Sequence, residues 1–234
     1  MEKDIYTWPF LAWLLPVPEM HLYIYIQYSV YKSCCIKQTP TLFRASKKGK
    51  MVLHHVEVLS REMVKPSSPT PLHLRNLKLS FLDQIAPPVY IPLIFFYQYE
   101  PGCNSDHAQK SKCLKQSLSE TLVLFYPLAG RIKSDYIIDC NDDGVEFVEA
   151  RVHTQLSHIV QNPNMEELKQ FLPIEPYGTR TSMVLAIQVN FLDCGGMVIG
   201  VCMSHCIADG SSLVTFMNSW ATISRGDKIG RAHV

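Results

Sequence analysis

The sequence has 234 residues, of which 47% are hydrophobic and 18% are charged, a balance typical of a globular domain and unlike that of a disordered chain. The formal net charge of +1 hides two compositions, because residues 1–50 carry a net +4, residues 51–228 carry a net −4, and Arg231 adds the last +1. A mildly acidic body without a basic stripe argues against nucleic acid as a partner.

The cysteines indicate a reducing compartment. None of them forms a CxxC pair, and several lie inside apolar runs, as small buried hydrophobic residues do. A secretory signal would begin with basic residues, whereas Glu2 and Asp4 flank Lys3 here. We therefore expect a cytoplasmic protein without structural disulfides. The eight cysteines are Cys34, Cys35, Cys103, Cys113, Cys140, Cys194, Cys202 and Cys206.

The first fifty residues differ from the rest, because they show no amphipathic period. The apolar run from Tyr6 to Tyr31 is interrupted by Pro16, Pro18 and Glu19, so no stretch reaches the roughly 18–20 residues that a membrane span requires. We expect translation to begin at Met51 and residues 1–50 to be an untranslated or disordered extension, with an unusual anchor or targeting segment as the alternatives. No membrane association is expected.

The other end of the chain has a different peculiarity. Residues 229–234, Ile-Gly-Arg-Ala-His-Val, match the translation of a common short-read library adapter, whose next triplet is a stop codon. We expect this tail to derive from the adapter and the natural protein to continue beyond Lys228. The organised domain should then span residues 51–228.

Regular elements become legible from residue 54. A strand is predicted over 54–61, followed by a proline-rich extended loop over 65–71. A dense β-branched and aromatic run predicts a buried strand over 91–98. Asp106 is placed to cap a helix that runs to about Phe125, with Leu114, Leu118 and Leu122 on one face.

The second half of the sequence also predicts both strands and helices. Two short strands, 136–140 and 145–149, flank the turn at 141–144, and a short helix follows over 164–171. Alternation predicts a strand over 185–191. Residues 197–204 are apolar on both faces and therefore suit the centre of a sheet. A helix starting at Ser211 or Ser212 carries Leu213, Phe216 and Trp220 at helical spacing. The fold class is α/β, with a mixed sheet and flanking helices.

The segment Ser204-His-Cys-Ile-Ala-Asp-Gly210 carries the chemistry. His205 ends the predicted central strand, and a glycine and a helix follow it, which is a rigid setting open to ligand. An unperturbed imidazole, with a pKa of about 6.5, is largely neutral at cytosolic pH and able to accept a proton. The HxxxD pattern alone is weak, however, because it occurs often by chance, and on this pattern alone a buried structural histidine is the favoured interpretation.

Two other types of site are disfavoured. Cys202, His205, Cys206 and Asp209 lack the second Cys/His pair that would complete a tetrahedral metal site. Cys206 as a nucleophile would have to aim at the same point as the adjacent His205, and its thiolate would need activation. We therefore expect neither a metal nor a covalent thiol intermediate.

Further motifs accompany HxxxDG: Leu-Ser-Phe-Leu-Asp-Gln at 79–84, Phe-Tyr-Pro-Leu-Ala-Gly-Arg at 125–131 and Asp-Cys-Asn-Asp-Asp-Gly-Val at 139–145. In their order and spacing, residues 51–226 resemble the plant BAHD acyltransferases, and most of all the alkaloid acetyltransferases among them. The resemblance implies a chloramphenicol acetyltransferase-like domain, the first of two. The second domain, with its DFGWG motif and most of the coenzyme A contacts, is absent here.

The resemblance also implies roles for single residues. His205 corresponds to the general base, which takes a proton from an acceptor hydroxyl, or less often an amine, as that atom attacks the thioester of acyl-CoA. Asp209 corresponds to a residue that pairs with an arginine and, with Gly210, supports the catalytic loop. Arg131 and Asp83 correspond to structural residues. The coenzyme A-binding residues of this chain stay unassigned.

The implied substrates are acyl-CoA, with acetyl-CoA expected, and a small-molecule acceptor such as an alkaloid. No metal or prosthetic group is implied, and the complete enzyme is expected to be monomeric. This chain alone should be inactive, because one wall of the channel is missing. The alternative is a truncated, non-catalytic paralogue that acts as a binding or interaction protein.

Overall fold

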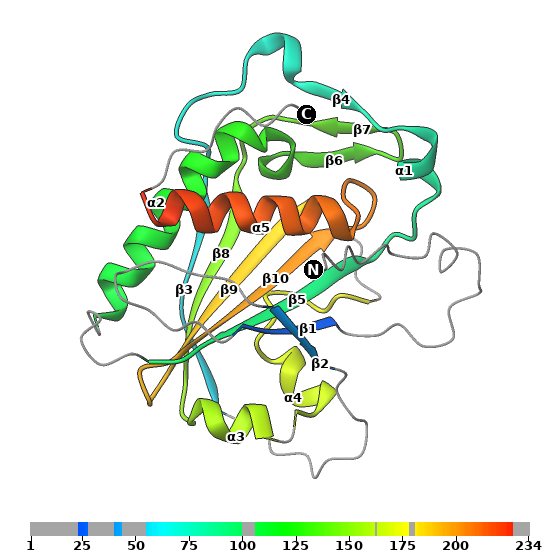
Figure 1. The fold of residues 1–234 in the computed structure, drawn as a ribbon. Coiled ribbons are helices and arrows are strands. Elements are labelled where there is room, and N and C mark those ends of the chain that lie inside the picture. The colour runs from blue at the N-terminus through cyan, green and yellow to red at the C-terminus, as the bar shows by residue number, and fades with distance from the viewer. Residues whose placement is uncertain are drawn as a thin grey trace, which may run out of the picture.

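The computed structural model describes residues 23–27, 40–43, 55–99, 106–161, 163–177 and 181–226. A seven-stranded sheet dominates these ranges, with strand order β2-β1-β5-β10-β9-β8-β3 (Figure 1). Its strands are β1 (Tyr23–Gln27), β2 (Pro40–Phe43), β3 (Val56–Val64), β5 (Tyr90–Tyr97), β8 (Val145–Val152), β9 (Leu185–Leu192) and β10 (Met197–Ser204). A three-stranded sheet contains β4 (Asn76–Lys78), β7 (Ile137–Asp139) and β6 (Arg131–Ser134).

Helices cover both faces of the large sheet. The buried side chains of α2 (His107–Leu124) and α5 (Gly210–Ser224) share one core with β8, β9 and β10. Those of α3 (Leu156–Gln161) and α4 (Met165–Lys169) form a second core with β5 on the opposite face (Figure 1). Short helices complete the described part: α1 (Phe81–Ile85) and the 3-10 turns η1 (Leu72–Leu74) and η2 (Tyr126–Ala129). The predicted α/β class with a mixed sheet is confirmed.

The long elements form where the apolar pattern predicted them. β10 is the middle strand and pairs antiparallel with both β5 and β9. The Asp106 carboxylate accepts the Ala108 N–H at 3.0 Å and caps α2, and Asn164 caps α4 in the same way. Capping supplies acceptors for N–H groups that have no partner within the helix. The described ranges contain no helix long and apolar enough to cross a membrane.

The turn at 141–144 does not connect two strands that pair with each other, as the sequence pattern suggested. It is present, with positive φ at Asp142 (59°) and Gly144 (97°), but the strands on either side do not pair with each other. β7 pairs with β4 and β6, whereas β8 pairs with β3 and β9. The Asp142 carboxylate instead accepts bonds from the N–H and hydroxyl of Thr70 at 2.9 and 2.6 Å. The turn therefore carries the chain from one sheet to the other.

Two strands fall in the segment 1–50, where no periodicity predicted them. β1 pairs in parallel with β5, and β2 pairs antiparallel with β1. The rest of that segment and the tail 229–234 lie outside the described residues. The boundaries at residues 50 and 228 therefore stay predictions.

Candidate active site

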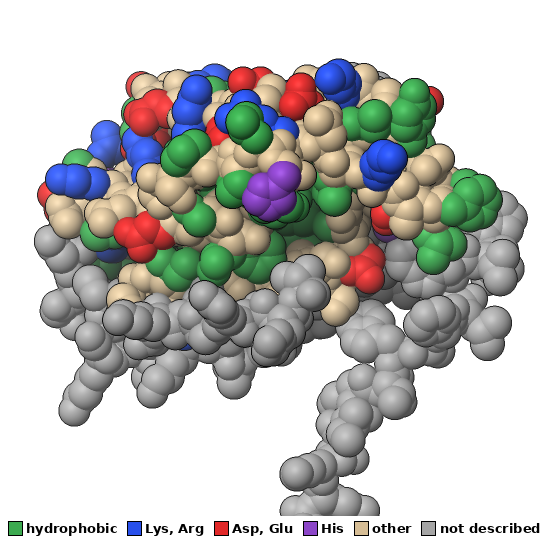
Figure 2. Space-filling model, turned by 90° about the horizontal axis from the view of Figure 1, so that it is seen from above, with side chains coloured by type: hydrophobic (Ala, Val, Ile, Leu, Met, Phe, Trp, Pro, Cys, Tyr) green, Lys and Arg blue, Asp and Glu red, His purple; other side chains and the backbone are tan. Residues whose placement is uncertain are grey.

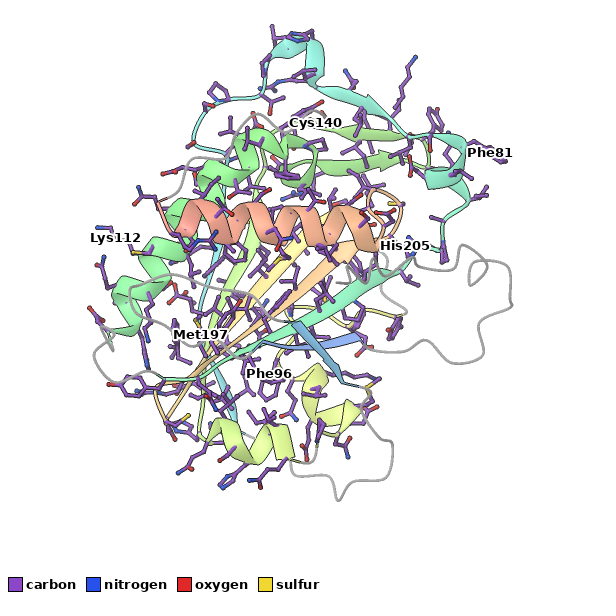
Figure 3. The ribbon with its side chains drawn as sticks, in the orientation of Figure 1. Phe81, Phe96, Lys112, Cys140, Met197 and His205 are labelled. Atoms are coloured by element: carbon purple, nitrogen blue, oxygen red, sulfur yellow. The ribbon has the colours of Figure 1, made fainter. Side chains whose placement is uncertain are left out.

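The candidate site begins with the backbone at the end of β10. The Ser204 N–H donates to the Val184 carbonyl at 2.8 Å, and the His205 N–H donates to the Val89 carbonyl at 2.9 Å. These two carbonyls belong to the segments that precede β9 and β5, the neighbours of β10 in the sheet. His205 therefore leaves the sheet from a backbone held on both sides. It lies beside the N-terminal end of α5 (Figure 3).

The two neighbours of His205 in sequence line a cleft that His205 itself does not line. Ser204 and Cys206 both line a small cleft, and the Ser204 hydroxyl is 2.9 Å from the Cys206 thiol. His205 does not line that cleft. The residue is partly exposed while its Nδ1 atom is buried.

Asp209 and Gly210 form the start of α5. The Asp209 carboxylate accepts the Ser212 N–H at 2.7 Å, and this bond lowers the pKa of the carboxyl below its usual value. Among the described residues Asp209 forms no ion pair, so the arginine implied by the resemblance is not seen there. A Cβ atom added at Gly210 would meet nothing within 4 Å. The structure thus shows Asp209 as the helix cap and open space around Gly210.

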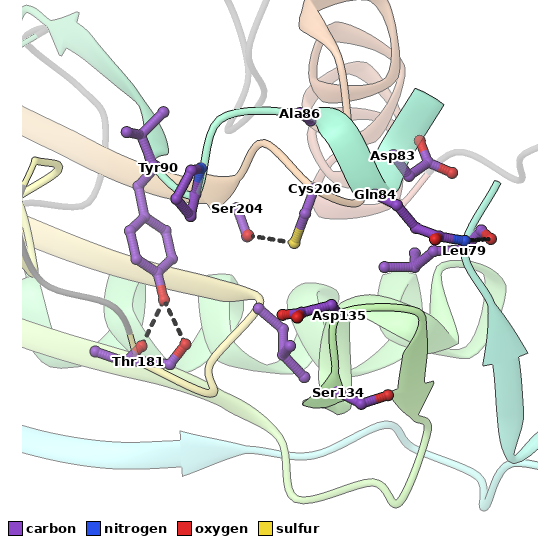
Figure 4. Close-up of a pocket in the computed structure, with 13 residues that line it drawn as sticks. Leu79, Asp83, Gln84, Ala86, Tyr90, Ser134, Asp135, Thr181, Ser204 and Cys206 are labelled. Carbon is purple, nitrogen blue, oxygen red and sulfur yellow. Dashed lines mark hydrogen bonds between the residues drawn. The ribbon is translucent and has the colours of Figure 1, made fainter. Parts of the chain in front are cut away.

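The cleft lies between the start of β5, the α1 region and the β6–β7 turn (Figure 4). It encloses about 40 Å³, which is room for a few water molecules only. Tyr90 and Thr181 line it at one side, and their hydroxyl groups are hydrogen-bonded. Sequence reasoning missed both residues. Neither belongs to a motif, and only the sheet register, which places Tyr90 opposite Ser204, brings them to the site.

Two buried cysteines, Cys140 and Cys202, are poor candidates for chemistry. Burial raises the pKa of the Cys202 thiol to about 12 and that of Cys140 to about 11, so both stay protonated at neutral pH. In the part of the chain that the structure describes, no three His, Cys, Asp or Glu side chains gather as metal ligands would.

Arg131 and Asp83 make structural contacts, as the resemblance implies. The Arg131 guanidinium donates to the Gly130 and Gly144 carbonyls, both at 2.8 Å. The Asp83 carboxylate accepts the Ser80 N–H at 2.9 Å and completes a capping box at α1.

On the face that carries the small sheet, acidic and basic side chains are interspersed with hydrophobic ones (Figure 2).

Comparison with known proteins agrees with this geometry. The model of the Transferase family matches residues 54–233. The chain is 50% identical over 171 residues to stemmadenine O-acetyltransferase from Catharanthus roseus, covering 70% of this chain and 41% of that protein. It is 48% identical over 178 residues to vinorine synthase from Rauvolfia serpentina, covering 74% of this chain and 42% of that protein.

Solved structures show the same fold. The crystal structure of vinorine synthase superposes with a TM-score of 0.71 at 48% identity, over 75% of this chain and 44% of that one. TRI101 of F. graminearum, complexed with coenzyme A and T-2 mycotoxin, superposes with a TM-score of 0.51 at 19% identity, over 67% of this chain and 40% of that one. The expected chloramphenicol acetyltransferase-like domain is thereby confirmed.

The motifs, the fold and the family match coincide on the same residues. The chain spans about 41% of the length of stemmadenine O-acetyltransferase and 42% of that of vinorine synthase. Because the family match covers residues 54–233, and because the four motifs quoted above from this sequence, at 79–84, 125–131, 139–145 and 204–210, lie within it, the chain belongs to that family, the Transferase family.

Proposed function

We propose that this chain is the N-terminal part of an acyl-CoA-dependent acyltransferase with His205 as the general base. The observation that carries the proposal is the position of His205. It ends the central strand and its backbone is held on both sides, in a chain that is 50% identical to an O-acetyltransferase. A base must be held within a fraction of an ångström of its working position, and a strand end provides that.

The proposed reaction is the attack of an acceptor hydroxyl on acyl-CoA. The His205 imidazole takes the proton of the acceptor hydroxyl while the hydroxyl oxygen attacks the thioester carbonyl of acyl-CoA. The C–O bond forms as negative charge builds on the carbonyl oxygen. When this tetrahedral oxyanion collapses, the C–S bond breaks and coenzyme A leaves as the thiolate. Positioned proton transfer of this kind contributes about 10²–10⁴-fold in rate.

Asp209 and Gly210 support this step without touching the reacting atoms. By capping α5, Asp209 fixes the far end of the loop that begins at His205. An arginine from outside the described residues is proposed as a second partner of its carboxylate. Loss of a helix cap typically costs about 1 kcal/mol, so a substitution at Asp209 can lower activity without a catalytic role.

The substrates are proposed from the relatives. Stemmadenine O-acetyltransferase and limonoid 21-O-acetyltransferase of Melia azedarach, 43% identical, are named for acetyl transfer to oxygen. These names support acetyl-CoA as the donor and a hydroxyl on an alkaloid or another bulky specialised metabolite as the acceptor. They favour an enzyme over a non-catalytic binding protein. A cytoplasmic, monomeric enzyme without a metal or prosthetic group completes the proposal.

The test compares residues 51–228 with the protein encoded by the complete transcript. Each is incubated with acetyl-CoA and a panel of alkaloid and limonoid alcohols, and thiol release and acetylated product are measured. We expect transfer by the complete protein and none by 51–228, because the proposed channel needs its second wall. Acetyl transfer by 51–228 at a rate comparable to that of the complete protein would overturn the proposed division of labour.

A further inference from the structure

The backbone around His205 is held by two carbonyl groups from separate parts of the chain. The Val89 carbonyl accepts the His205 N–H, and the Val184 carbonyl accepts the Ser204 N–H. Each carbonyl is adjacent in sequence to another residue that matters here, since Tyr90 follows Val89 and Met183 precedes Val184. A contact between Tyr90 and Met183 therefore also links the Val89 carbonyl to the Val184 carbonyl. These are the two groups that accept the N–H groups of His205 and Ser204.

Tyr90 makes that junction with its side chain. Its hydroxyl donates to the Met183 carbonyl at 2.7 Å and lies 2.5 Å from the Thr181 hydroxyl oxygen. The Met183 N–H donates to the same Thr181 oxygen at 3.2 Å, and the Tyr90 N–H donates to the Pro176 carbonyl at 3.1 Å. Figure 4 shows the Tyr90 ring pointing away from β10 toward the Thr181 segment. The contacts close a ring that runs from Val89 through Tyr90, Met183, Val184 and Ser204 to His205.

We propose that Tyr90 is a positioning residue for His205, holding the carbonyls of Val89 and Val184 in the register that fixes the backbone of the base. The proposal rests on the proposed role of His205. Tyr90 touches no reacting atom in this account. It acts through the two carbonyl groups, and the imidazole follows because the ring is carried by the backbone they hold.

The surroundings of Tyr90 make its hydroxyl effective in this role. The side chain is 3% exposed, and burial raises the pKa of the phenol above its usual value, so the hydroxyl stays a neutral donor at every physiological pH. Removing it leaves the part-buried Met183 carbonyl without that donor. An unmade bond of this kind costs more than its net contribution when made. The local structure should then open more often around Ser204 and His205.

The chain offers a matched control in Tyr177. Its hydroxyl is also buried, and it forms no hydrogen bond within the described residues. Tyr90→Phe and Tyr177→Phe therefore remove the same atom from two buried sites, of which only one is bonded. Thr181→Val is a second variant, which removes one hydroxyl of the ring of contacts and leaves Tyr90 in place.

The experiment uses the full 234-residue chain with isotope-labelled histidine, and His205→Gln assigns the resonances. We expect Tyr90→Phe to shift and broaden the His205 imidazole signals and to speed exchange of the His205 amide about 3- to 10-fold, as loss of about one hydrogen bond predicts. Thr181→Val should change the same signals in the same direction, and Tyr177→Phe should leave them at their wild-type positions.

The proposal is overturned if Tyr90→Phe leaves the His205 imidazole signals and amide exchange as they are in Tyr177→Phe, even where global stability falls. If Tyr90→Phe does not fold, Thr181→Val decides, and unchanged His205 signals in that variant overturn the proposal. The readout is the position of the ring and not acyl transfer. A failure here is therefore distinct from a failure of His205 as the base.

Discussion

Asp209, which is proposed to support the loop that begins at His205, caps helix α5. Its carboxylate accepts the Ser212 N–H in the first turn of α5, where N–H groups lack partners within the helix. The loop between His205 and this cap is short. Any fraying of the first turn of α5 therefore reaches the histidine.

We expect Asp209→Ala to lower the free energy of unfolding by about 1 kcal/mol, since a lost N-cap typically costs that much. Asp209→Asn should retain most of the stability, because asparagine caps as well as aspartate does. Urea denaturation of the two variants and the wild type measures both values. Equal losses of unfolding free energy in the two variants would show that the negative charge of Asp209, and not its hydrogen bond as a helix cap, stabilises the fold.

The same cap has a pH dependence of defined sign. The Ser212 N–H bond holds the folded-state pKa of Asp209 below its usual value, so the carboxylate stabilises the fold fully above the unfolded pKa of about 3.9. This stabilisation is lost as the pH falls through the folded-state pKa. The gap in unfolding free energy between wild type and Asp209→Ala should therefore be constant near neutrality and narrow below about pH 4. A gap that widens in acid would contradict the assignment.

At this scale, the sequence predicted part of the candidate site, and these residue roles stay predictions. His205 was proposed because it follows an apolar run and belongs to a motif, and Asp209 because it belongs to the same motif. Tyr90 and Thr181 were missed. They are 91 residues apart in sequence, and no local pattern marks a pair that only the pairing of β5 with β10 brings to the strand end.

A lysine of helix α2 forms ion pairs with two strands of the large sheet. The Lys115 ammonium lies 2.5 Å from the Glu149 carboxylate of β8 and 2.9 Å from the Glu62 carboxylate of β3. Burial lowers the pKa of Lys115, but the hydrogen bonds that its ammonium donates to Glu149 and Glu62 outweigh this effect, and the net shift is upward. The Glu149 side chain is only 17% exposed. Its charge therefore depends on this partner.

Lys115→Met keeps the aliphatic stem and removes the charge. We expect it to lower the free energy of unfolding by about 1–3 kcal/mol, because Glu149 is left largely buried and unpaired. Lys112→Met is the control, since Lys112 is an exposed lysine on the same helix with no ion pair among the described residues. Equal stability of the two variants in urea denaturation would argue against a stabilising role for these ion pairs.

The segment that follows α4 packs against strand β10 on the face of the sheet opposite α2 and α5. The Asn190 amide of β9 donates to the Phe171 and Val198 carbonyls, both at 3.1 Å. The Phe171 carbonyl lies so close to Gly200 that an added Cβ would be 2.0 Å from its oxygen. Gly200 is therefore required for this segment to lie against the strand that leads to His205.

We expect Gly200→Ala to destabilise the fold by about 1–3 kcal/mol, because a backbone carbonyl must move to admit the methyl group. Gly210→Ala places the same methyl group in open space at the start of a helix, and should change stability by less than about 0.5 kcal/mol. Thermal or urea unfolding compares the two. A Gly200→Ala protein as stable as Gly210→Ala would show that the close approach is easily relieved.

The predictability of the elements follows their length. α2, α5, β5, β9 and β10 carry enough apolar periodicity to be read from sequence, and their main caps are visible as single residues. β4, β6, α1 and α3 are only three to six residues long and were not predicted. The turn at 141–144 was read correctly, but its strands join different sheets because partner choice is decided by long-range packing.

At the scale of the whole molecule, one sheet lies between two helical layers and presents His205 at the end of its middle strand (Figure 1). The sequence predicted this architecture through its motifs more than through its periodicity, because periodicity does not specify strand order. The chain covers only 41% of stemmadenine O-acetyltransferase.

The most direct test of His205 as the general base is the rate of acetyl transfer by the complete protein and its variants. Acetyl-CoA turnover is measured for wild type, His205→Ala and His158→Ala, the last being an exposed histidine of α3. We predict a loss of about 10²–10⁴-fold for His205→Ala, with a wild-type rate for His158→Ala. A His205→Ala protein that folds and transfers acetyl at the wild-type rate would contradict the account.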